Sequence, residues 1–287
     1  MNVSLADKWQ GFKQITRMDK PIGTYLLLWP TYWALWVAAD GIPNFHVFLV
    51  FSLGVFVMRS AGCVINDFAD RKVDGKVQRT EQRPLITGLI SPKEAIVIFF
   101  VLLFVALLLV LTLEPYTIML SFVAVLLASL YPFMKRYTHL PQVVLGAAFS
   151  WGMIMAFAEV YGSVPLVAWL LFLSNLLWTV AYDTMYAMAD REDDIKIGVK
   201  STAILFGEHD KRIIAFLQIL TLGLLYTVGE ILAFGWPYAL SLIISAGFFS
   251  YQQMLIVKRE RAKCFQAFLN NHFVGLIVFI GIFVEHL

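Results

Sequence analysis

The sequence is poor in charged residues. Only 15% of its 287 residues are Asp, Glu, Lys or Arg, whereas soluble domains contain about 25%, and 60% of the chain is hydrophobic. Mean hydropathy is correspondingly high, at +0.75. This composition excludes an ordinary soluble domain and predicts an all-α polytopic membrane protein that lies in a lipid bilayer.

Cysteine is almost absent as well. Cys63 and Cys264 are expected near the same membrane face, and no Cys-x-x-Cys pair occurs, so we expect neither a disulfide nor a thiolate metal site. The net charge of +2 comes from basic residues segregated along the chain, which do not form a nucleic-acid-binding face. We therefore expect no nucleic-acid partner.

Nine segments are long and apolar enough to be membrane-spanning helices, which need about 20 residues each. The segments are residues 22–39, 46–66, 93–113, 115–134, 141–159, 165–187, 213–233, 236–256 and 268–286. Residues 1–21 mix acids with bases before the first apolar segment, which favours a retained first helix over a cleaved signal peptide.

The basic residues indicate the orientation of these helices. If the connections alternate between two sides, with the N-terminus inside, every Lys and Arg except Arg59 falls on the inner side or at an inner helix end. The outer connections carry only single acids, such as Asp40 and Glu114. The positive-inside rule then predicts a cytoplasmic N-terminus, an external C-terminus and an odd number of spans. A bacterial inner (plasma) membrane is the simplest location.

Two similar acidic clusters follow apolar segments at the predicted cytoplasmic side. Residues 66–74 read Asn-Asp-Phe-Ala-Asp-Arg-Lys-Val-Asp, and residues 182–194 read Tyr-Asp-Thr-Met-Tyr-Ala-Met-Ala-Asp-Arg-Glu-Asp-Asp. Each cluster opens a connection of about 25 residues, far longer than the outer ones, and long connections often carry function. The parallel suggests an internal repeat within a single domain, residues 1–287, with halves of about 1–140 and 141–287.

Helical spacing places the acids of each cluster on one face, because positions 4, 7, 8 or 11 apart share a side of an α-helix. The first stripe contains Arg59, Asn66, Asp70 and Asp74, and the second contains Asp183, Tyr186, Asp190 and Asp193 or Asp194. Facing carboxylates repel one another unless a cation lies between them. Mg²⁺ fits this position because it takes one or two carboxylates together with water and phosphate oxygens.

Basic residues close to both clusters add donors suited to a diphosphate. They are Arg71, Lys72, Arg79, Arg83, Lys196 and Lys200. The combination predicts Mg²⁺-dependent cleavage of a carbon–oxygen bond to diphosphate.

Other residues near the clusters have simpler interpretations. We expect Asp67, Glu81, Glu192 and Asp210 to be ordinary solvated residues at helix ends. Arg59 lies about two turns inside the apolar zone, at an insertion cost of about 2.5 to 3.5 kcal/mol, so it needs a partner: substrate, Asp70 or a helix carbonyl. Most Trp residues are expected to face lipid or to anchor the chain at the membrane interface. Tyr131, Tyr182 and Tyr186 are better candidates for a pocket.

These motifs carry a resemblance that extends over essentially the whole chain. Asn66-Asp67-x-x-Asp70-x-x-x-Asp74 and Asp183-x-x-Tyr186-Ala187-x-x-Asp190-x-x-Asp193-Asp194 resemble the paired aspartate motifs of the UbiA superfamily of intramembrane aromatic prenyltransferases. More narrowly, segments 18–23, 28–31 and 131–146 resemble the 4-hydroxybenzoate polyprenyltransferase family of ubiquinone biosynthesis.

The resemblance implies nine helices around a central cavity with a cytoplasmic cap. It also implies Mg²⁺-dependent transfer of a polyprenyl group from polyprenyl diphosphate to the ring carbon ortho to the hydroxyl of 4-hydroxybenzoate. The implied metal ligands are Asn66, Asp70, Asp74, Asp190 and Asp194, among which Asp70 and Asp190 are the catalytic candidates. The substrate-binding candidates are Arg59, Asn66, Arg71, Lys72, Arg136, Tyr182, Tyr186 and Lys196.

The resemblance leaves two roles open. Either Arg136 or Arg59 binds the carboxylate of the benzoate, and either Asp190 or the released diphosphate takes the last ring proton.

Other functions fit the sequence less well. A UbiA-type enzyme with another aromatic acceptor is the nearest alternative. A divalent-cation transporter would need acids near the bilayer midplane, whereas these lie at one boundary among bases. An aspartyl protease would need a Gly-x-Gly-Asp motif, which is absent, and a CDP-alcohol phosphotransferase would need further aspartates after Gly88.

Overall fold

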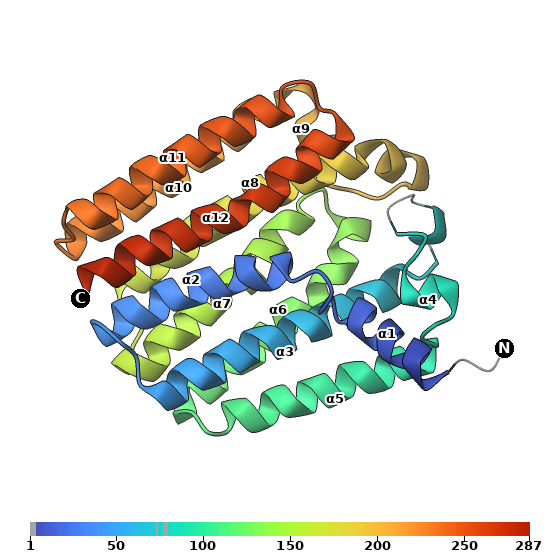
Figure 1. The fold of residues 1–287 in the computed structure, drawn as a ribbon, viewed down its shortest axis with the longest axis horizontal. Helices are drawn as coiled ribbons and strands as arrows, with labels where there is room; N and C mark the ends of the chain where they lie inside the picture. Colours follow the sequence, from blue (N-terminus) through green and yellow to red (C-terminus); the bar gives the residue numbers. More distant parts are fainter. Residues whose placement is uncertain (1–3, 73, 77–79) are drawn as a thin grey trace.

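The computed structural model describes residues 4–72, 74–76 and 80–287, and within these ranges it consists of helices and connections without a strand (Figure 1). The long helices are α2 (Ile22–Ala39), α3 (Phe45–Asp70), α5 (Pro92–Val110), α6 (Pro115–Tyr137), α7 (Pro141–Tyr161), α8 (Leu166–Ile197), α10 (Asp210–Ile231), α11 (Trp236–Ile256) and α12 (Arg261–Glu285). The short elements are α1 (Leu5–Ile15), η1 (Asp74–Lys76), α4 (Pro84–Thr87), α9 (Thr202–Phe206) and η2 (Gly207–His209).

The long helices confirm the predicted multi-pass membrane protein. In the described part of the chain, eight helices have the length and apolar composition of membrane spans. The remaining predicted span coincides with α2, whose 18 residues include Pro30, Trp33 and Trp36 and lie within the bundle beside α7 and α12 (Figure 1). The nine predicted segments thus correspond to the nine long helices among the described residues.

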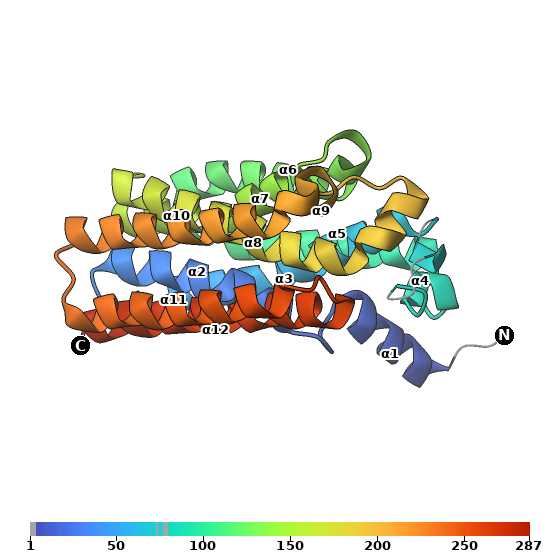
Figure 2. The same cartoon turned by 90° about the horizontal axis from the view of Figure 1, so that it is seen from above.

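The helices run side by side and leave the short elements at one end (Figures 1 and 2). We call η1, α4, α9 and η2 the cap, and they lie at the same end as α1 and the N-terminus. The C-terminus lies at the opposite end, which agrees with an odd number of crossings. Local sequence sets these boundaries: Ser91 and Glu94 form a capping box at the start of α5, and Gly198, with φ of 73°, ends α8.

A dense core fixes the position of α8, the helix that carries the second acidic stripe. Trp33 and Trp178 stack with ring centroids 5.6 Å apart, and each is at most 1% exposed. The Trp33 indole donates to the Gly275 carbonyl oxygen at 2.9 Å, and the Trp178 indole donates to Asn271 Oδ1 at 2.8 Å. These bonds tie α2 and α8 to α12 in the middle of the bundle.

The first acidic stripe differs from the prediction, because α3 ends at Asp70 and Asp74 belongs to η1. A single helical face through Asp74 is therefore wrong. Arginines satisfy the last carbonyl groups of α3: Arg71 Nη1 donates to Phe68 O at 2.5 Å, and Arg136 Nη2 donates to Ala69 O at 2.6 Å. Because these carbonyl oxygens already accept hydrogen bonds from side chains, the helix can end at Asp70. The second stripe is helical throughout, since α8 continues to Ile197.

Candidate active site

A cavity of about 810 Å³ lies inside the bundle and brings both acidic clusters to its wall. Its cap end is polar, and its far end is lined by aliphatic and aromatic side chains of α5 and α6, including Leu107, Val110 and Phe122. The predicted site residues that line the cap end are Arg59, Asn66, Asp70, Asp74, Tyr182, Tyr186, Asp190 and Asp194. One charged end and one apolar end suit a ligand with an ionic head and a hydrocarbon tail.

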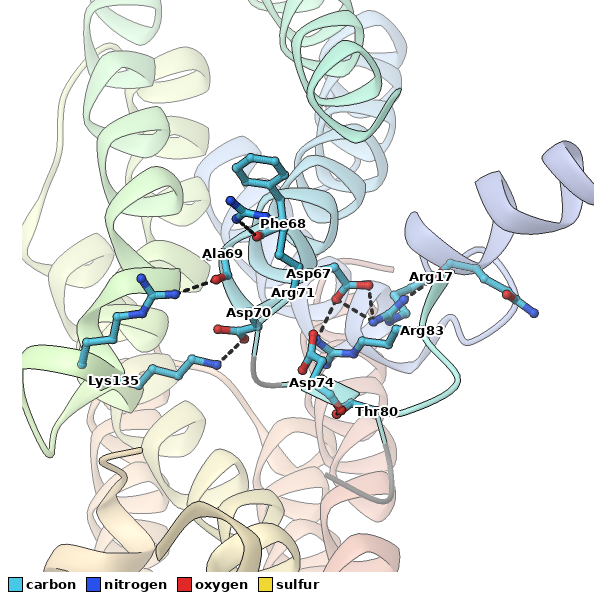
Figure 3. Close-up of polar contacts among 12 residues, drawn as sticks. Arg17, Asp67, Phe68, Ala69, Asp70, Arg71, Asp74, Thr80, Arg83 and Lys135 are labelled. Carbon is cyan, nitrogen blue, oxygen red and sulfur yellow. Dashed lines mark hydrogen bonds and ion pairs between the residues drawn. The ribbon is translucent and has the colours of Figure 1, made fainter. Parts of the chain in front are cut away.

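Buried ion pairs hold the first cluster together (Figure 3). Arg17 Nη2 donates to both carboxylate oxygens of Asp67, at 2.8 and 2.9 Å. Arg83 Nη1 lies 2.9 Å from Asp67 Oδ1 and donates to Asp74 Oδ2 at 2.7 Å. Arg83 therefore links Asp74 to Asp67 near the end of α3. The Lys135 ammonium group pairs with Asp70 Oδ2 (Figure 3).

The prediction that Asp67 and Asp210 are ordinary solvated residues is wrong. Asp67 is 1% exposed within its arginine pairs, and Asp210 is fully buried. Asp210 accepts hydrogen bonds from Arg191 and Arg259, which ties α8 to the start of α10 and to the α11–α12 connection. Buried carboxylates need such partners, and helical pattern alone does not reveal partners distant in sequence.

Arg17, Arg83 and Lys135 match the three carboxylates of the first cluster in number, but they do not fully compensate them. Burial raises the pKa of Asp74; Arg83 opposes that rise, while the neighbouring Asp70 and Asp67 carboxylates add to it. Asp70 Oδ1 is buried and has no hydrogen-bond partner among the described residues. A cation that entered the cavity here would relieve both deficits.

The donor set fits Mg²⁺, because carboxylate and amide oxygens are hard ligands. Within the described residues, no three acidic, histidine or cysteine side chains are gathered closely enough to hold a metal ion by themselves. Mg²⁺ does not require such a cage, since it is commonly held by one or two carboxylates together with substrate phosphates and water. The site suits a metal that arrives with its phosphorylated ligand.

Arg59 lines the cavity from within α3, eleven residues before that helix ends at Asp70. Its Nη1 donates to Cys63 Sγ at 2.8 Å, and the guanidinium carbon lies 6.0 Å from the centre of the Phe149 ring. Its Nε is buried and has no hydrogen-bond partner in the described part of the chain. Tyr131 and Tyr182 line the same cavity. Arg59 therefore retains a donor for a ligand in an aromatic setting.

Four predicted substrate-binding residues lie outside the cavity wall as the described residues define it. Arg71 stacks on Phe68, with 4.1 Å from its guanidinium carbon to the ring centre, and points away from Asp70 (Figure 3). Arg136 contacts Ala69 O, Lys72 is exposed, and the Lys196 side chain is 73% exposed. Of the other basic candidates, Arg83 and Lys200 line the cavity, and Arg79 lies outside the described residues.

The prediction of site residues missed Arg17 and Lys135, which line the polar end. Helical spacing could have identified Lys135, because it lies four residues after Tyr131 and shares its face of α6, whereas Arg136 does not. Arg17 gave no such signal. It sits in the α1–α2 connection with φ of 60°, and only the tertiary fold brings it to Asp67.

A helical bundle around a cavity with one polar and one apolar end is found in a known class of protein. Residues 27–277 match the UbiA prenyltransferase family, so the chain belongs to that family. It is 70% identical, over 99% of both chains, to a protein of Colwellia psychrerythraea named 4-hydroxybenzoate octaprenyltransferase. It is 57% identical, over the full length of both chains, to a protein of the same name from Aeromonas hydrophila.

Solved structures share the fold. An apo UbiA homologue from Aeropyrum pernix matches with a TM-score of 0.81 and 22% identity, over 92% of this chain and 98% of that one. A UbiA homologue from Archaeoglobus fulgidus, bound to GPP and Mg²⁺, matches with a TM-score of 0.72 and 16% identity, over 96% and 99% of the two chains. These similarities support the same helical architecture.

Proposed function

We propose that the protein transfers a polyprenyl group from polyprenyl diphosphate to the ring carbon ortho to the hydroxyl of 4-hydroxybenzoate, releasing diphosphate. This step belongs to ubiquinone biosynthesis. The observation that carries the proposal is one cavity with two acidic clusters and a deep arginine at its polar end and hydrocarbon side chains at the other. The full-length relatives named 4-hydroxybenzoate octaprenyltransferase support the choice of acceptor.

Asn66, Asp70, Asp74, Asp190 and Asp194 hold the diphosphate head through Mg²⁺ in this proposal. The homologue bound to GPP and Mg²⁺ supports this choice of metal. When bound, Mg²⁺ neutralises the diphosphate oxygens and makes diphosphate a better leaving group. Arg83 and Lys135 pair with Asp74 and Asp70 and line the cavity, where their charged donors would suit the diphosphate.

Arg59 binds the carboxylate of 4-hydroxybenzoate, and Arg136 does not. Arg59 lines the cavity and has an unused donor, whereas Arg136 is bonded to the end of α3 outside the wall. A guanidinium can hold a carboxylate through two parallel bonds, which fixes the orientation of the ring. Tyr131, Tyr182 and Tyr186 surround this position and can stabilise positive charge on the allylic carbon through their ring faces.

The reaction breaks the carbon–oxygen bond of the allylic diphosphate and forms a carbon–carbon bond to the phenol ring, after which the ring loses a proton. Asp190 or the released diphosphate accepts that proton. The apolar wall of α5 and α6 holds the prenyl tail and keeps out water, which would otherwise capture the allylic cation.

The polar end of the cavity faces the cytoplasm of a bacterial inner membrane in this proposal. Most Lys and Arg residues lie in the connections or helix termini at this end of the bundle, and the positive-inside rule assigns the side that carries them to the cytoplasm.

A transfer assay tests the function. Membranes containing the protein are incubated with radiolabelled 4-hydroxybenzoate, a polyprenyl diphosphate and Mg²⁺, and the lipid fraction is counted. We expect a labelled lipid from the wild type and from Glu192→Gln, an exposed acid on α8, but none from Asp70→Asn or Asp190→Asn. A wild type that makes no labelled lipid but prenylates another aromatic acid would replace the acceptor while keeping the reaction class.

A further inference from the structure

Gly23, the second residue of α2, lies directly against the guanidinium of Arg59. A Cβ atom built on Gly23 would lie 2.4 Å from both Nε and Nη2 of Arg59 and 2.7 Å from its Cζ. Ordinary contacts at Cβ are 3.4 Å or longer. A side chain at position 23 is therefore incompatible with the observed position of Arg59.

The guanidinium is otherwise loosely held. Among the described residues its one hydrogen bond is to Cys63 on its own helix, and the Phe149 ring of α7 lies beside it. The backbone of α2 at Gly23 also lies against the guanidinium. The absence of a side chain at Gly23 thus leaves the space in which the arginine head lies.

The same geometry indicates what a larger residue would change. The atoms that an added Cβ would meet are the far end of a flexible side chain, so Arg59 would move while the backbone stayed in place. Alanine at the second position of a helix carries no conformational penalty relative to glycine. Contact relief would require a shift of about 1 Å, a displacement that can cost a reaction about a hundredfold when it misplaces a reactant.

We propose that Gly23 is a positioning residue that sets the place of the Arg59 guanidinium and, through it, the orientation of the acceptor ring. This inference rests on the proposed role of Arg59 as the group that binds the acceptor carboxylate. It assigns to the start of α2 a part in acceptor recognition, although Gly23 itself offers no side chain to the acceptor.

Gly23→Ala tests the inference in the full-length protein. We expect the KM for 4-hydroxybenzoate to rise about tenfold, the change that follows from weakening one charge-assisted pair. The KM for polyprenyl diphosphate and the Mg²⁺ requirement should stay within about twofold. Gly223→Ala is the matched control, because Gly223 is a glycine within helix α10 whose added Cβ would meet nothing within 4 Å. If Gly23 had only a structural role, Gly23→Ala would raise the KM values of both substrates together.

A double-mutant cycle separates this inference from the role of Arg59. Arg59→Met should weaken binding of radiolabelled 4-hydroxybenzoate to purified protein, and adding Gly23→Ala to it should change nothing further. If Arg59→Met leaves acceptor binding intact, the proposed role of Arg59 fails. If Arg59→Met weakens binding but Gly23→Ala does not, or if the two effects add, the positioning role of Gly23 is overturned. A Gly23→Ala protein that does not fold also overturns it, since the structure requires only a side-chain shift.

Discussion

Lys135 and Arg136 are neighbours in sequence but contact different groups at the end of α3, which makes them a matched pair for mutation. Lys135 pairs with Asp70 in the cavity, and Arg136 bonds to Ala69 O outside it. Asp70 is 1% exposed, and its second oxygen has no partner among the described residues. Lys135→Met therefore leaves a buried carboxylate without compensation.

Removing one partner of a buried ion pair typically costs about 3 to 5 kcal/mol. The Lys135 side chain is 24% exposed, so we take the lower end, about 3 kcal/mol, for the loss in unfolding free energy of the metal-free protein. Mg²⁺ with diphosphate should stabilise this variant about 1.4 kcal/mol less than it stabilises the wild type, because the loss of the Lys135 ammonium group weakens donor binding about tenfold. Arg136→Met removes one helix-end bond, a loss of about 1 kcal/mol that the ligand should not recover.

Unfolding of the detergent-solubilised variants, with and without Mg²⁺ and a prenyl diphosphate, measures these differences. Transfer kinetics should show an increase of about tenfold in the donor KM for Lys135→Met and an unchanged acceptor KM for Arg136→Met. The reasoning is refuted if ligand stabilises both variants equally, or if Arg136→Met alone abolishes acceptor binding.

Three further predictions concern the remaining groups. Asp210→Asn should lower the unfolding free energy by about 3 kcal/mol, because Arg191 and Arg259 lose a fully buried partner, and the change should appear in thermal unfolding with little change in either KM. Because the pKa of Asp74 is raised, its contribution to the stability of the metal-free protein is present at low pH and is lost as pH rises through that pKa. The difference in unfolding free energy between wild type and Asp74→Asn, measured against pH, should show this loss. A difference that does not depend on pH would contradict the prediction. Chelation of divalent metal should abolish transfer in membranes, and added Mg²⁺ should restore it; transfer that continues in excess chelator would remove the metal from the proposal.

Hydropathy and charge were sufficient to predict the helical architecture. The predicted segments 22–39 and 236–256 coincide with α2 and α11, because apolar length, proline and glycine mark those boundaries. Both acidic clusters were also predicted to share one cavity, since each follows a helix at the same end of the bundle. Local pattern carries this information.

The tertiary pairs could not be predicted in the same way. Asp67 meets Arg17 and Arg83, which lie 50 residues before and 16 residues after it in the sequence, so no helical periodicity joins them. The end of α3 at Asp70 likewise depends on Arg136, a side chain from another helix. Burial and charge compensation at these positions follow from packing between distant segments.

The central claim is that the two acidic clusters act together on one Mg²⁺-bound diphosphate. Its most direct test is Mg²⁺-dependent binding of a non-reactive prenyl thiodiphosphate to the purified protein. Asp70→Asn in the first cluster and Asp190→Asn in the second should each abolish the Mg²⁺-dependent part of binding, whereas Glu192→Gln should retain it. Wild-type Mg²⁺-dependent affinity in either aspartate variant would contradict the account.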